Sequence, residues 1–142
     1  MSLRDQSTPT VIARTERWLV LHKPSGWLSI PGRAPGVPVL SEWAAQEHAP
    51  VWTVHRLDRE TSGVILFART AEAHREASRW FQDHLVRKTY ECLAIGALNA
   101  PVTRVKVPIE GAPSVTQVES RESFSAGVEL IQKSVFWPEP CP

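Results

Sequence analysis

Two short apolar runs separated by a charged loop constrain this chain more than any other stretch. Residues 51–54 (VWTV) and 64–68 (VILFA) are rich in β-branched and aromatic residues, which predicts two strands. The residues between them, HRLDRETSG, include the Ser, Thr, Asp and Gly that commonly interrupt strands. The sequence therefore places Asp58 on a loop that is held at both ends by a strand.

The residues around Asp58 suit chemistry that needs an ionised carboxylate. Arg56 and Arg59 flank it, and opposite charge close by favours the charged form of a carboxyl group. An ionised carboxylate acts as a nucleophile or a general base rather than as a proton donor. The alternative from the residues alone is that this Arg-Leu-Asp turn makes a structural ion pair.

Two stretches of small and turn-forming residues are predicted to brace the loop. In the first, Pro24 favours an extended conformation at Lys23 and Gly26 permits a bend, so residues 23–26 predict a rigid corner. In the second, hydroxyl groups can bond local backbone and a glycine can take a positive φ, which predicts that the loop is fixed by Thr61, Ser62 and Gly63.

Hydrophobic periodicity predicts the remaining elements. Apolar residues with helical spacing predict a short helix over residues 40–48 with Ser41 as its N-cap, and a longer helix over 71–85 with Thr70 as its N-cap. In the stretch KTYECLAI, Cys92 is predicted to be a small buried residue. The predicted strands, besides the two above, are residues 11–14, 18–22, 88–95, 103–109, 115–119 and 127–132.

Length, composition and charge set broad limits. A chain of 142 residues is enough for one domain, and it contains no apolar run of the ~18 residues that a membrane span requires. Two cysteines are too few for a disulfide framework and have no metal-like spacing. The net charge of +1 does not indicate nucleic acid. Basic residues outnumber acidic ones five to two over residues 1–40 and seven to five over 55–90, but not over 91–142, where they number four to six.

Three stretches in the same order resemble one family. HKPSGWLSIPG, HRLDRETSG and RKTYECLAIG are similar to the motifs of the RluA-like family of RNA pseudouridine synthases. The resemblance implies that Asp58 is the catalytic residue, that Tyr90 stacks against a flipped-out uracil, and that Arg56 fills the gap left in the RNA. It implies supporting roles for His55, Lys23, Gly26, Thr61, Ser62, Gly63 and Lys88.

The resemblance also implies a fold and partners. We expect an α+β fold: a mixed, mainly antiparallel sheet with helices, like a pseudouridine synthase catalytic domain but incomplete at its C-terminus. The expected partner is structured RNA, either tRNA or ribosomal RNA, with no cofactor and no metal. From the residues alone, the start MSLRDQSTPT lacks the apolar core of a signal peptide and no apolar run could span a membrane, so we expect the protein in the cytoplasm and not in a membrane. An incomplete sheet exposes an apolar edge and face, which favours self-association.

The resemblance covers about residues 11–119. The family continues into a T-G-R-x-H-Q-I-R segment whose arginine pairs with the catalytic aspartate, and no such segment follows residue 119. We therefore expect a disordered N-terminus over residues 1–9, the N-terminal part of the catalytic domain over 10–119, and a divergent or run-out segment over 120–142. The alternative functions are a truncated, catalytically impaired RNA-binding remnant and, less favoured, an unrelated aspartate-dependent hydrolase.

Overall fold

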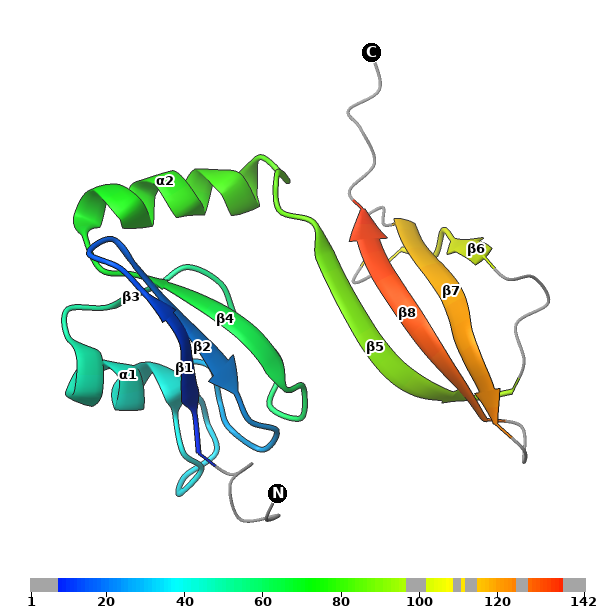
Figure 1. Ribbon diagram of the computed structural model, residues 1–142, viewed down its shortest axis with the longest axis horizontal. Helices are drawn as coiled ribbons and strands as arrows, with labels where there is room; N and C mark the ends of the chain where they lie inside the picture. The colour runs from blue at the N-terminus through cyan, green and yellow to red at the C-terminus, as the bar shows by residue number, and fades with distance from the viewer. Residues whose placement is uncertain (1–7, 97–101, 109–110, 112–114, 125–127, 137–142) are drawn as a thin grey trace. The chain divides into compact units, whose positions relative to one another are not determined.

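The computed structural model describes residues 8–96, 102–108, 111, 115–124 and 128–136, and the chain divides into two compact units, Met1–Asp83 and His84–Pro142. Each unit has its own four-stranded sheet (Figure 1). The expected α+β class, with mainly antiparallel strand pairing, is confirmed. We expected one sheet, and the described strands instead form two, because sequence periodicity predicts strands without showing which of them pair.

The sheet of the first unit has the strand order β1-β2-β4-β3, and every pair in it is antiparallel. Its strands are β1 (Thr10–Arg14), β2 (Trp18–Lys23), β3 (Trp52–Thr53) and β4 (Gly63–Ala68). Alternate residues of β2 are buried, as expected for a strand with one face on a core. The core lies between this sheet and a helix. It consists of Leu19, Leu21, Leu40, Ala44, Ile65 and Phe67.

Helix α1 (Leu40–His48) contributes Leu40 and Ala44 to that core. The prediction of Ser41 as its N-cap is wrong: Val39 occupies this position and no side chain caps the helix. The first two amides of α1 are instead satisfied from another segment, since the Leu40 N–H donates to the Leu28 carbonyl (2.8 Å) and the Ser41 N–H to the Ser29 carbonyl (3.2 Å). The start of α1 is thereby fixed to residues 28–29.

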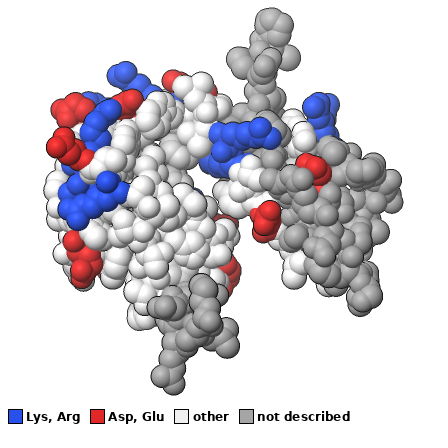
Figure 2. Space-filling view, in the orientation of Figure 1, with Lys and Arg blue, Asp and Glu red and all other residues white. Residues whose placement is uncertain are grey.

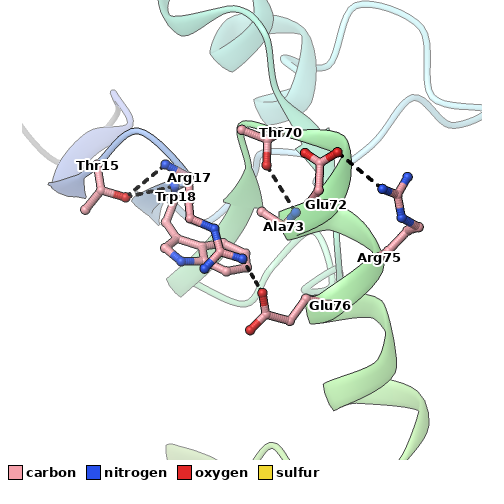
Figure 3. Close-up of polar contacts among 8 residues, drawn as sticks. All are labelled: Thr15, Arg17, Trp18, Thr70, Glu72, Ala73, Arg75 and Glu76. Carbon is pink, nitrogen blue, oxygen red and sulfur yellow. Dashed lines mark hydrogen bonds and ion pairs between the residues drawn. The ribbon is translucent and has the colours of Figure 1, made fainter.

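Helix α2 (Ala71–Gln82) begins as the sequence predicts, because the Thr70 hydroxyl accepts a hydrogen bond from the Ala73 N–H at 3.1 Å (Figure 3). The prediction that the helix extends to residue 85 is wrong. His84 has a φ of 57°, a left-handed conformation that ends the helix, and Leu85 beyond it is 70% exposed. No helix in the described part of the chain has the length and apolar character of a membrane span.

The sheet of the second unit has the order β5-β8-β7-β6, again with all pairs antiparallel. Its strands are β5 (Lys88–Ile95), β6 (Val102–Val105), β7 (Val115–Phe124) and β8 (Val128–Phe136). The domain boundary expected at residue 119 thus falls inside β7, and β8 pairs on both sides with neighbouring strands. Residues 1–7 of the N-terminus expected to be disordered, and residues 137–142 of the expected run-out segment, lie outside the described part.

The edge strand β5 is more exposed than its sequence predicts. Cys92 is exposed, so its predicted burial is wrong. Leu93 and Ile95, which alternation places together on the opposite face, are 67% and 96% exposed. Alternation assigns residues to two faces of a strand, but whether either face is covered depends on what packs there.

Candidate active site

Asp58 lies at the tip of the loop between β3 and β4, with its side chain exposed. A tight turn holds its backbone, because the Thr61 N–H donates to the Asp58 carbonyl at 3.1 Å. Gly63 then opens β4 with a φ of 144°, a conformation that L side chains rarely adopt. The positive φ predicted for Gly63 is thus present, whereas Thr61 holds the loop through its backbone N–H and not through the hydroxyl that the sequence suggested; Ser62 is exposed.

The corner at residues 23–26 contacts this loop directly. The Lys23 ammonium group, fully buried, donates to the carbonyls of Pro24 (3.0 Å), Trp27 (2.8 Å) and Arg59 (3.0 Å). The Gly26 N–H donates to the same Arg59 carbonyl at 2.9 Å, and Gly26 has the positive φ (86°) that the bend requires. Lys23 and Gly26 thus join the corner to the residue that follows Asp58.

Burial is the main influence on the charge of Lys23. It holds the pKa of Lys23 below its ordinary value, because removal from water disfavours the charged ammonium, while the Glu60 and Asp58 carboxylates act in the opposite direction. The three carbonyl acceptors compensate for the water that the ammonium group loses.

Two serines, which the sequence analysis did not select, extend this contact. The Ser25 hydroxyl donates to the Glu60 carbonyl at 2.9 Å, and the Ser29 hydroxyl donates to the Leu57 carbonyl at 2.6 Å. Ser29 also accepts from the Leu57 N–H at 3.0 Å. The only sequence feature that pointed to these serines was their position in HKPSGWLSIPG. Their partners lie 35 and 28 positions away, and bonds over such separations leave no local sequence pattern.

His55 links the start of the loop to β4 and α2. Its Nε2 accepts a hydrogen bond from the Leu66 N–H at 3.0 Å, which requires that nitrogen to be unprotonated. Its ring stacks on Phe81, with the ring centroids 4.6 Å apart and the planes at 17°. The supporting role expected for His55 therefore has a structural form, a bridge between the loop, the sheet and the helix.

Replacing His55 with phenylalanine should lower the free energy of unfolding by about 1–3 kcal/mol, because stacking on Phe81 is kept but the Leu66 N–H loses its acceptor. Urea unfolding of both proteins measures the difference. His55→Gln is the control that keeps an acceptor and removes the ring. If the phenylalanine variant is as stable as the unchanged chain, the hydrogen bond contributes nothing.

The charges around the loop differ from the expected arrangement. Arg59 pairs with Glu60, with Nε 3.3 Å from Oε1, and not with Asp58. Among the side chains that the structure describes (residues 8–96, 104–108, 111 and 115–119), no basic group forms an ion pair with Asp58, and Arg56 is exposed. Arg59 therefore does not pair with the carboxylate that it flanks, and the alternative of a structural ion pair in the Arg-Leu-Asp turn is not found among the described side chains.

Basic side chains do not gather into a single patch on the face of the first unit that Figure 2 shows. Blue and red side chains alternate there, in the area that α2 occupies in Figure 1. Arg17 pairs with Glu76, and Arg75 with Glu72 at 3.3 Å (Figure 3). Opposite charges on and beside α2 are thus largely matched, and this face has no uniform positive field.

The first unit brings together most of the residues that the sequence selects, namely Lys23, Gly26, His55, Arg56, Asp58, Thr61, Ser62 and Gly63. Tyr90 and Lys88 belong to β5 of the second unit, where both are half-buried; Tyr90 lies opposite Lys133 of β8. Among the described residues, no group of three or more His, Cys, Asp or Glu side chains could hold a metal ion.

Comparison with known proteins decides the family. The sequence pattern of the RNA pseudouridylate synthase family matches residues 17–133. The chain belongs to this family. It is 40% identical over 89 residues to the tRNA pseudouridine synthase C of Pectobacterium carotovorum (61% of this chain, 24% of the relative). It is 38% identical over 100 residues to the dual-specificity RNA pseudouridine synthase RluA of Yersinia pestis (70% and 48%).

A solved structure supports the fold. The human RNA pseudouridylate synthase domain containing 1 matches with a TM-score of 0.76 over 98% of this chain and 64% of that one, at 18% sequence identity. The resemblance seen in the three motifs is confirmed, and the family match extends 14 residues beyond residue 119, where we expected it to end. The chain spans about half or less of the length of the two bacterial relatives.

Proposed function

We propose that this chain carries the aspartate loop of an RNA pseudouridine synthase, which isomerises uridine to pseudouridine in tRNA or ribosomal RNA. The observation that carries the proposal is Asp58 itself: an exposed carboxylate on a loop whose carbonyls at Leu57, Arg59 and Glu60 are all bonded to residues 23–29. Family membership and the names of the relatives support the reaction and the RNA substrates.

In this reaction the bond between N1 of uracil and C1′ of the sugar breaks, the base turns, and C5 bonds to C1′. C5 loses its proton and N1 gains one, so the reaction needs neither an oxidant nor a cofactor. Asp58 would act either by attacking C1′ or by removing a sugar proton. Both actions require a carboxylate that is ionised and held in place, and the bonded loop supports the second requirement.

Two further residues complete the proposal. Arg56, exposed three residues after Thr53 of β3, would enter the space that the flipped uridine leaves, where a planar cation can stack and contact phosphate. Tyr90 would stack on the flipped base. We also propose a cytoplasmic location and self-association through the second sheet; the exposed Leu93 and Ile95 of the edge strand β5 support the latter.

The test uses tRNA and ribosomal RNA labelled with tritium at C5 of uridine. Because C5 loses its hydrogen when it bonds to C1′, each pseudouridine formed releases one tritium to water. Reactions with protein in excess over RNA allow slow turnover to be followed. Release from either RNA supports the proposal, and absence of release together with absence of RNA binding contradicts it.

The alternative function is an RNA-binding remnant with little catalysis. It is favoured by the lack of an ion pair to Asp58 in the part of the chain that the structure describes. The two candidates differ in the assay above: an impaired remnant binds a uridine-containing stem-loop yet releases almost no tritium. An enzyme does both.

Replacing Tyr90 with alanine should weaken binding of a uridine-containing stem-loop by about 1–3 kcal/mol, the usual contribution of one base–aromatic stack. Tyr90→Phe keeps the ring and should cost much less. Titration of a fluorescent stem-loop at fixed salt measures both. Equal losses in the two variants would rule out stacking as the role of Tyr90.

A further inference from the structure

Ser29 makes an unusual pair of hydrogen bonds next to Asp58. Its hydroxyl donates to the carbonyl of Leu57 (2.6 Å) and accepts from the N–H of the same residue (3.0 Å). One side chain thus satisfies both backbone groups of the residue immediately before Asp58. At 4% exposure, Ser29 is shielded from the water that would otherwise compete for these bonds.

The backbone of Ser29 is itself fixed. The Leu28 N–H donates to the Pro38 carbonyl at 3.0 Å, and the carbonyls of Leu28 and Ser29 accept from the first amides of α1. Residues 28 and 29 are therefore attached to a helix whose Leu40 and Ala44 lie in the core. Because the backbone of Ser29 is attached to α1, the Ser29 hydroxyl cannot easily follow movements of the loop. It can therefore restrain the loop.

On the other side of Asp58, the Arg59 carbonyl is held by Lys23 and by the Gly26 N–H, and the Glu60 carbonyl by Ser25. The backbone is thus bonded both before and after Asp58. The bonds from residues 23–26 to the backbone after Asp58 come from three groups, whereas among the described residues Ser29 alone bonds the backbone of Leu57. Loss of the Ser29 hydroxyl would therefore remove the hydrogen bonds to the Leu57 backbone, although the Leu57 side chain stays packed against the core.

We propose that Ser29 is a positioning residue: its hydroxyl fixes the backbone of Leu57 and thereby the direction of the Asp58 carboxylate. The inference rests on the proposed catalytic role of Asp58. Ser29 does not touch the substrate, and its effect should appear in the rate of the chemical step and not in RNA binding.

The test compares Ser29→Thr with Ser29→Val. These side chains have the same shape and add the same bulk to a buried site, and only threonine keeps the hydroxyl. We expect the valine variant to exchange the Leu57 amide hydrogen at least about fivefold faster than the threonine variant, as loss of an ordinary hydrogen bond implies. The Thr61 amide, which bonds the Asp58 carbonyl, should also exchange faster, whereas the amides of Leu21 and Ile65 should not change.

In the tritium assay, the valine variant should be slower than the threonine variant by roughly 10- to 100-fold in kcat with KM nearly unchanged, the order that a misplacement of about 1 Å costs. Equal exchange at Leu57 and Thr61 in the two variants overturns the proposal, and so does equal turnover of the two variants if the activity of the unchanged chain is measurable. If both variants fail to fold, Ser29→Ala is compared with the unchanged chain by the same measurements.

The exchange measurements do not depend on turnover. If the chain is inactive, exchange at Thr61 still decides whether Ser29 positions Asp58. The proposed function is tested separately by replacing Asp58. Retained turnover after that replacement would remove Asp58 from the mechanism while leaving the exchange result for Ser29 standing.

Discussion

Asp58→Asn is expected to abolish tritium release from uridine-labelled RNA, with a loss of at least about a thousandfold, the scale seen when a reacting group is removed. Asparagine has nearly the same shape but no charge, and it can neither attack C1′ nor remove a proton. The fold should be unaffected, because the hydrogen bonds that hold the loop are made to its backbone and not to the Asp58 carboxylate. The Thr61 N–H bonds the Asp58 carbonyl, and residues 23–29 bond the carbonyls of the neighbouring residues.

Glu60 provides a matched control. It is an exposed carboxylate two residues away whose ion pair with Arg59 is also exposed, so Glu60→Gln removes the same charge from the same loop. We expect this variant to keep turnover within a fewfold, since exposed pairs contribute little. RNA binding should be nearly equal in the two variants and the unchanged chain. Turnover that survives Asp58→Asn, or that falls equally in both variants, would remove Asp58 from its proposed role.

The second large effect concerns the 142-residue chain itself, which should be slower than a longer relative by several orders of magnitude. In the family that the motifs resemble, an arginine of a later segment pairs with the catalytic aspartate. Nothing of that form follows residue 119 in this sequence. Among the side chains described, those of residues 8–96, 104–108, 111 and 115–119, Arg59 is engaged with Glu60 and none forms an ion pair with Asp58. Positioning and charge stabilisation together account for several kcal/mol of a barrier.

The comparison requires the RluA of Yersinia pestis, which is 38% identical over 100 residues, with the same RNA at the same salt concentration. Salt must be fixed because phosphate contacts make RNA affinity strongly salt-dependent. A rate for the 142-residue chain close to that of the relative would refute the prediction. Arg121 or Lys133 would then be the first residues to replace in search of the missing cation.

The local elements of the first unit were determined by the sequence. Apolar patterning in residues 18–22 and the β-branched and aromatic residues of 64–68 predicted β2 and β4, and Thr70 followed by helical spacing predicted the start of α2. These features depend on neighbours within a few positions, so propensity and capping chemistry reveal them. The three motifs also indicated the family, which the comparisons confirm.

Features that depend on contacts between distant segments were not predicted from the sequence, or were predicted wrongly. The sequence predicted Ser41 as a helix cap, whereas the carbonyls of residues 28 and 29 accept the first amides of α1. It predicted burial of Cys92, which is exposed. It did not select Ser25 or Ser29, and it could not show that Lys23 would be buried under three carbonyls.

The loop around Asp58 shows which features the sequence determines and which depend on the tertiary structure. The position of Asp58, the positive φ of Gly63 and the flanking strands follow from residues adjacent in the chain. The restraint of the loop comes from residues 23–29, through bonds from Lys23, Ser25 and Ser29 to backbone carbonyls 28 to 36 positions later in the chain. Every residue has such a carbonyl, so the partner of a donor leaves no mark on the sequence, and only the packing of the two segments decides which carbonyls are reached.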